Sequence, residues 1–158
     1  MFETEAIIPL SEDVFRLLRD IIKDYCGLYF DDSSRYLIEK RLSRRVKSHH
    51  LTLKVYSATE KFSPGDFNGL KNQMRRPSVS IPMNIAGGCG RMEESELRPV
   101  FEAARKSASE LQYLFLLARD LGLLSKEECN ALLNEIVEIK KILALGPEAK
   151  KDSLAPNS

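Results

Sequence analysis

The chain contains two clusters of positively charged residues that could bind phosphates or carboxylates. Arg75 and Arg76 are adjacent, and Arg91 follows a glycine-rich turn in the same stretch, 73–91. A planar guanidinium can donate two parallel hydrogen bonds to a phosphate or a carboxylate. This first cluster therefore favours either salt bridges between subunits, made with the acidic C-terminal half, or contacts with RNA or DNA.

The second cluster lies in residues 35–47, where six positive charges stand against one negative charge, Glu39. On a helix, Arg41 and Arg45 align one turn apart. Such a surface could bind a nucleic-acid backbone or an acidic protein helix. Alternatively, the long side chains cover apolar neighbours on an ordinary solvated helix. The candidate binding residues of the two clusters are Arg41, Arg44, Arg45, Lys47, Arg75, Arg76 and Arg91.

No pattern in the chain predicts catalysis. The cysteines Cys26, Cys89 and Cys129 are scattered without a CxxC spacing. The adjacent His49 and His50 would point about 100° apart on a helix, so they cannot share a metal. No strand–GxGxxG–helix unit is present to hold a nucleotide cofactor. We predict a protein that is not an enzyme, with no metal and no cofactor.

The composition suits one domain or two small ones with a real core. Of the 158 residues, 43% are hydrophobic and 30% are charged. The acidic start, MFETEAIIPLSED, is unlike a signal peptide, and no apolar run is long enough for a membrane span, so a cytoplasmic protein is expected. The net charge of +1 hides an asymmetry, because 51–92 carries six positive and two negative residues while 93–158 carries nine and twelve. This polarity could orient subunits.

Hydrophobic periodicity predicts an all-α fold. The first helix runs from an N-cap at Ser11 to Gly27. Asp32 or Ser33 is expected to cap a second helix, and a third covers Leu51 to Phe62. Since no linker rich in Gly, Pro or Ser separates the second from the third, the two could run together as one rod.

The next predicted helix starts near Asp66 and contains Pro77 and Pro82. Each proline removes one intrahelical hydrogen bond and clashes with the preceding turn, so a bent or interrupted helix is expected. Asn84 is expected to satisfy the backbone groups that the prolines free. The glycine-rich turn at 87–90 ends this helix.

Two further helices complete the prediction. Gly122 ends the first of them, and a capping box of Ser125 and Glu128 begins the second, which Gly146 ends. One face of the first forms a seam with steps of four and three residues, in which the alanines allow close helix approach. The seam residues are Leu97, Phe101, Ala104, Ala108, Leu111, Phe115 and Ala118.

Residues from about 51 to 145 resemble the 23S ribosomal RNA intervening-sequence protein family. The matching text is VYSATEKF, then NGLKNQMRRPSVSIPMNIAGGCGR, then SASELQYLFLLARDLGLLSKEE. The resemblance implies an antiparallel four-helix bundle that assembles as a homopentamer, in a family without an established enzymatic activity. Distant relatives bind nucleic acid.

Residues from about 10 to 51 resemble the helical N-terminal domain of CheR-type chemoreceptor methyltransferases. The matching text is LSEDVFRLLRDIIKDYCGLYF, then SSRYLIEKRLSRRVKSHHL. The resemblance implies a helical cap whose basic helix touches an acidic receptor. Methyl transfer is not expected, because the sequence contains no catalytic methyltransferase domain.

We therefore predict an N-terminal helical module over 1–50, a four-helix bundle over 51–146 and a disordered tail over 147–158. The expected function is that of a non-catalytic oligomeric scaffold or adaptor that binds RNA or DNA through its basic surface. The alternative is a protein-interaction module of chemotaxis type, whose basic N-terminal helix docks an acidic partner. Nucleic-acid binding should weaken steeply with salt, whereas helix docking should depend on hydrophobic hot spots.

Overall fold

The structure is a computed structural model that describes residues 7–27, 29–63, 65, 69–88 and 94–144. Within these ranges it is all-α, with five α-helices, one short 3-10 helix and no strand. The elements in chain order are α1 (Glu12–Cys26), η1 (Asp32–Ser34), α2 (Arg35–Glu60), α3 (Leu70–Gly88), α4 (Glu94–Asp120) and α5 (Lys126–Ala144). None of the described helices is both long enough and apolar enough to cross a bilayer.

The ends of α1 are those that the sequence predicted. The Ser11 hydroxyl accepts a hydrogen bond from the backbone N–H of Val14, which satisfies one of the free donors of the first turn. Gly27 ends the helix with φ of 67°, a left-handed conformation that suits glycine. Both boundaries of the predicted first helix are confirmed.

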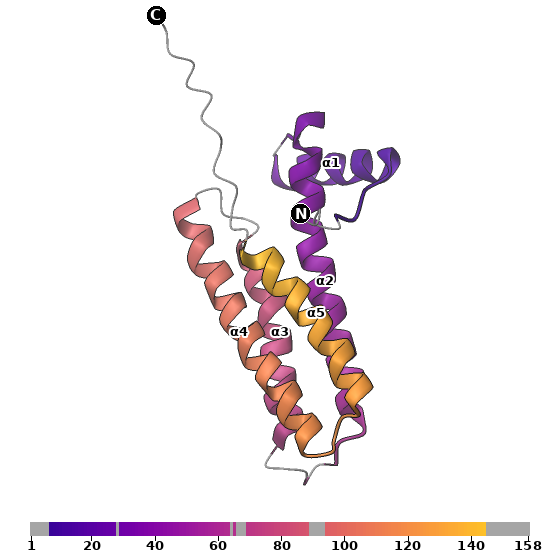
Figure 1. Ribbon diagram of the computed structural model, residues 1–158. Coiled ribbons are helices and arrows are strands. Elements are labelled where there is room, and N and C mark those ends of the chain that lie inside the picture. Colours follow the sequence, from indigo (N-terminus) through magenta and orange to yellow (C-terminus); the bar gives the residue numbers. More distant parts are fainter. Residues whose placement is uncertain (1–6, 28, 64, 66–68, 89–93, 145–158) are drawn as a thin grey trace, which may run out of the picture.

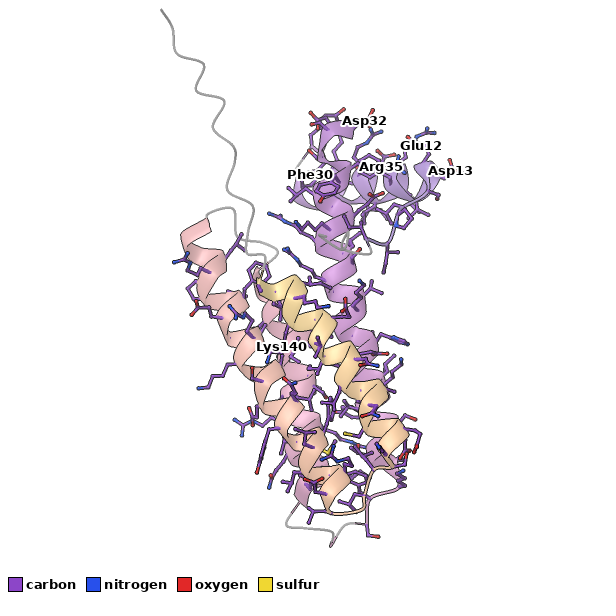
Figure 2. All side chains as sticks on the ribbon, in the orientation of Figure 1. Glu12, Asp13, Phe30, Asp32, Arg35 and Lys140 are labelled. Atoms are coloured by element: carbon purple, nitrogen blue, oxygen red, sulfur yellow. The ribbon has the colours of Figure 1, made fainter. Side chains whose placement is uncertain are left out.

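Arg35, at the start of α2, attaches α1 to the rest of the chain (Figure 2). Its guanidinium donates to the Leu10 carbonyl oxygen and to Glu12 Oε2, the latter at 2.8 Å, and lies 5.4 Å from the centre of the buried Phe15 ring. The Glu39 carboxylate accepts a hydrogen bond from the Leu10 N–H at 2.9 Å. This hydrogen bond is the main cause of the lowered pKa of Glu39. The N-terminal segment is therefore held by polar contacts around one aromatic ring.

Residues 35–60 form one continuous helix, α2 (Figure 1). The separate helix predicted over residues 51–62 is therefore wrong, and the alternative of a single rod is confirmed. Its N-terminal turns carry α1, and its C-terminal half packs against α3 and α5. The cap predicted at Asp32 or Ser33 is wrong, because the Asp31 carboxylate caps η1 and α2 begins after Ser34.

Both prolines lie inside α3, which continues through them without interruption from Leu70 to Gly88. Pro82 has no N–H, so the Ser78 carbonyl loses its intrahelical donor. The Thr52 hydroxyl, on α2, donates to this oxygen at 2.6 Å in a buried position. Asn84 was predicted to satisfy the freed groups, but it donates to the Ser80 carbonyl instead, at 2.8 Å. The compensation comes from a neighbouring helix because a carbonyl buried in a core needs a partner there.

The four helices α2, α3, α4 and α5 lie side by side around a shared core (Figure 1). The seam predicted on α4 faces inward, since all its residues are buried except the half-buried Phe101. Ala104, Ala108 and Ala118 are completely buried, which lets α3 and α5 approach the backbone of α4 closely. The largest completely buried side chains of this core include Leu51, Leu70, Met74, Ile81, Leu111, Phe115 and Ile136.

The turn between α4 and α5 also follows the sequence. Gly122 has φ of 73°. The capping box is present. Ser125 Oγ accepts a hydrogen bond from the Glu128 N–H at 3.1 Å, and the Glu128 carboxylate accepts one from the Ser125 N–H at 2.8 Å. Lys61, just after α2, donates a hydrogen bond to the Glu128 carboxylate at 2.7 Å. This hydrogen bond is the main cause of the lowered pKa of Glu128. The end of α2 is thus linked to the start of α5.

Candidate interaction surfaces

Part of the basic stretch on α2 packs against aromatic rings. Arg44 is 6% exposed, and its guanidinium lies 5.3 Å from the centre of the Phe101 ring on α4. Lys40 is also buried, with its ammonium 5.8 Å from the Tyr36 ring. Cations over aromatic faces contribute to local packing. Both side chains therefore contribute to packing, in agreement with the interpretation that basic stems cover apolar neighbours.

The other predicted residues of this stretch face solvent to different degrees. Arg45 is exposed, whereas Arg41 and Lys47 are half-buried. No negatively charged residue occurs from Lys40 to His50. The cations of α2 that an external partner could contact are thus Arg41, Arg45 and Lys47.

Arg75 is bound to its own chain. On α2, it donates to the Thr59 hydroxyl at 2.9 Å, to the Tyr56 carbonyl at 3.1 Å and to the Glu60 carboxylate at 2.7 Å. Its guanidinium lies 4.4 Å from the centre of the Tyr56 ring, and its side chain is 19% exposed. The hydrogen bond from Arg75 is the main cause of the lowered pKa of Glu60. Arg75 therefore joins α3 to α2, and its acidic partner lies at the end of α2 rather than in the acidic C-terminal half.

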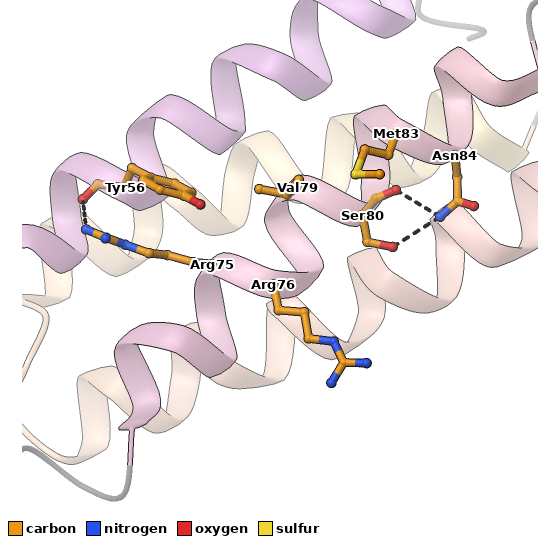
Figure 3. Close-up of a pocket in the computed structure, with 7 residues that line it drawn as sticks. All are labelled: Tyr56, Arg75, Arg76, Val79, Ser80, Met83 and Asn84. Carbon is orange, nitrogen blue, oxygen red and sulfur yellow. Dashed lines mark hydrogen bonds between the residues drawn. The ribbon is translucent and has the colours of Figure 1, made fainter.

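The structure does not bring the three arginines of the first cluster together. The Arg76 side chain points outward from α3 (Figure 3), is exposed and makes no hydrogen bond or ion pair with any other described residue. Arg91 lies outside the described residues. Of the two arginines of this cluster that the structure describes, Arg76 is the one whose guanidinium a partner could reach.

An open depression of about 570 Å³ lies between α2 and α3 (Figure 3). Its exposed apolar side chains are Tyr56, at 41% exposure, and Met83, at 66%. We call this surface the α2–α3 face. The residues that line the depression are Tyr56, Arg75, Arg76, Val79, Ser80, Met83 and Asn84.

Sequence reasoning named the two arginines of this face but missed its apolar part. Arg76, Val79 and Met83 are spaced by three and four residues, which places them on one side of α3. That spacing was a signal that could have been used. The contribution of Tyr56 depends on how α2 lies beside α3, and a linear pattern does not give that arrangement.

Chemistry other than binding has little support in this geometry. Among the described residues, no three His, Cys, Asp or Glu side chains lie close enough to hold a metal ion. Cys129 is completely buried, and its burial raises the pKa of the thiol, so the thiolate is disfavoured. His49 and His50 are exposed on α2.

Comparison with known proteins assigns the chain to a family. The profile of the 23S rRNA-intervening sequence proteins matches residues 40–145, which is most of the chain. The chain belongs to this family. The profile of the CheR methyltransferase all-alpha domain matches residues 13–53. Both resemblances noted in the sequence are confirmed, and the two matches overlap within α2.

A solved structure shares the fold of this intervening-sequence family member. It is a protein of unknown function from the S23 ribosomal protein family of Bacteroides thetaiotaomicron. The TM-score is 0.61 at 20% sequence identity, and the alignment covers 66% of this chain and 95% of the other. No curated protein matches the chain.

Proposed function

We propose that this protein is a non-catalytic, self-associating helical scaffold whose subunits meet at the α2–α3 face. The observation that carries the proposal is the pair of exposed side chains, Tyr56 and Met83, that line the depression. Aromatic residues, Met and Arg are enriched at protein interfaces. Here they surround an open, preformed hollow, as an interface hot spot does.

Arg75 and Arg76 have different parts in this proposal. Arg75 is fixed by three hydrogen bonds to α2 and stacks on Tyr56, so it holds the Tyr56 ring in place before a partner arrives. Ordering a side chain in advance reduces the entropy lost on binding. Arg76 is the exposed cation of the face. It would pair with a carboxylate of the next subunit.

Family membership supports the assembled state. We propose that α2 to α5 form the antiparallel four-helix bundle of the intervening-sequence proteins, and that five copies assemble into a ring. The N-terminal module, which resembles the methyltransferase cap domain, would then be displayed in several copies. Such a display increases avidity for any partner of that module.

Light-scattering mass on the purified protein tests the proposal. We expect a mass near that of five chains for the native protein. Met83→Glu should reduce the mass to that of smaller species, because it places a charge in the centre of the interface. Asn130→Glu adds the same charge to an exposed position on α5 and should leave the mass unchanged. A native monomer, or equal masses for the two variants, would overturn the proposal.

Nucleic-acid binding is the second outcome that this measurement can reveal. Arg75 and Arg44 are held by intramolecular contacts, so the accessible cations are Arg41, Arg45, Lys47 and Arg76, spread over two helices. Added RNA or DNA should raise the mass at low salt, and lose that effect at moderate salt, only if these cations bind phosphates. An increase that persists at moderate salt would not be explained by such binding.

A further inference from the structure

The amphipathic helix α1 has apolar residues on a second face, which the described part of the chain leaves exposed. Phe15 is 1% exposed and packs under Arg35. In contrast, Val14 is 49% exposed, Leu17 62% and Ile21 45%. Their steps of three and four residues place these three side chains in one stripe along the helix. We call them the α1 stripe.

Acidic residues follow one edge of the α1 stripe. Asp13, Asp20 and Asp24 are seven and four residues apart, so they align along the helix next to Leu17. Asp20 lies 3.6 Å from its chain neighbour Arg19. Asp13 and Asp24 make no ion pair with any other residue that the structure describes. The stripe is thus an apolar surface with a negative edge, in which only Asp20 has an ion-pair partner among the described residues.

The middle of α2 offers the opposite pattern. Val46 and Leu53 are 51% and 55% exposed and, seven residues apart, lie on one side of the helix. Arg45 and Lys47 flank Val46 on its two sides, and the exposed His49 and His50 lie between Val46 and Leu53. This part of α2 therefore carries exposed apolar side chains within a positively charged stretch that has no acidic residue from Lys40 to His50.

We propose that the α1 stripe of one copy docks on the middle of α2 of a second copy. Within one chain, Arg35 and Glu39 hold α1 on the first turns of α2, and none of the described residues covers the exposed stripe. The second copy supplies an apolar surface of complementary charge. Because the two surfaces differ, the contact is head-to-tail. It uses neither Met83 nor the depression, so it does not depend on the proposed α2–α3 interface.

Reciprocal charge reversal tests this contact. The first variant carries Asp20→Lys and Asp24→Lys, and the second carries Arg45→Glu and Lys47→Glu. Each variant alone brings like charges together at the contact. An equimolar mixture again pairs opposite charges in both directions, because the basic α1 of one meets the acidic α2 of the other. Both variants are made in the full chain carrying Met83→Glu, so that association through the α2–α3 face is removed.

Sedimentation velocity over a range of concentrations is the measurement. We expect each variant alone to self-associate about tenfold or more weakly than the parent, and the mixture to associate as the parent does. A control with Arg105→Glu and Lys106→Glu on α4 makes the same charge change on another helix and should behave as the parent. Circular dichroism melts should show that every variant is folded.

Other results of the same measurement would contradict the α1–α2 contact or the α2–α3 interface separately. If the mixture associates no better than either variant alone, the contact does not exist and the proposal is wrong. Short RNA added at low salt then shows whether Arg45 and Lys47 bind a polyanion instead. If Met83→Glu leaves the native mass unchanged while the mixture recovers association, the α2–α3 proposal fails and the α1–α2 contact stands.

Discussion

At the scale of single residues, buried polar groups explain features that charge patterns did not. Arg75 belongs to a set of contacts with Thr59, Tyr56 and Glu60 that joins two helices. Thr52 supplies the hydrogen bond that Pro82 cannot make. In each case a polar side chain has a specific partner across a helix boundary, and removing one partner exposes the other to a desolvation cost.

Thr52→Val should reduce the free energy of unfolding by about 1–3 kcal/mol, because it leaves the buried Ser78 carbonyl without its donor. The matched background is Pro82→Ala, in which the restored N–H of residue 82 can donate to that carbonyl. In that background the cost of Thr52→Val should be smaller by about 1 kcal/mol. Urea unfolding of the four proteins measures this coupling, and purely additive effects would contradict the assignment.

Glu39 should make the stability depend on pH in the acidic range. Hydrogen bonding from the Leu10 N–H lowers its pKa below the ordinary value of 4.5. The carboxylate therefore stabilises the fold fully above that value, and the contribution is lost as the pH falls through the lower, folded-state pKa. Thermal melts from about pH 7 to pH 3 should show that Glu39→Gln is less stable than the native protein near neutrality. A difference that does not shrink on acidification would exclude this role.

At the scale of the helices, close approach matters more than the presence of glycine or proline. Two adjacent glycines near the end of α3 differ in their surroundings. A Cβ at Gly88 would lie 3.0 Å from Val100 Cγ1 on α4, whereas a Cβ at Gly87 would meet nothing within 4 Å. Glycine is therefore needed for packing only at position 88.

Gly87→Ala should stabilise the protein by about 0.5–1 kcal/mol, since alanine favours the helix and no atom opposes it. Gly88→Ala gains the same propensity but must displace Val100, so it should be less stable than Gly87→Ala by about 1 kcal/mol. Denaturant unfolding of the two variants provides the comparison. Equal stabilities would show that α4 moves away at no cost.

At the scale of the whole molecule, the chain combines an N-terminal unit with a core of four helices. The contacts described for α1 and the segment before it go to η1 and the first turns of α2. The core is formed by the second half of α2 with α3, α4 and α5. The division predicted at residue 50 lies inside one continuous helix, and it remains a prediction.

Phe15→Ala should loosen α1 without unfolding the core, because it removes the one ring on which Arg35 stacks. Burial of such a ring contributes about 3–5 kcal/mol by truncation. Hydrogen exchange should become faster in α1 and in the first turns of α2, and should stay unchanged in α3 to α5. Faster exchange throughout would show that the two units unfold together.

Local sequence patterns were enough to predict most of the helices and where several of them end. Ser11, Gly27, Gly122 and the Ser125–Glu128 capping box act within one turn, so local chemistry sufficed. The seam of α4 was also predictable, because helical periodicity identifies the buried face. The four-three spacing does not show which helices meet that face.

The contacts of the charged and polar residues depend on the tertiary structure and could not be predicted from local sequence. Arg75 and Arg76 are neighbours in the chain, yet Arg75 is held against α2 and Arg76 faces solvent. Thr52 and Ser78 are 26 residues apart, and the α2–α3 face requires side chains of both helices. These outcomes depend on how helices lie against one another, which is set by the packing of the whole core rather than by the local sequence.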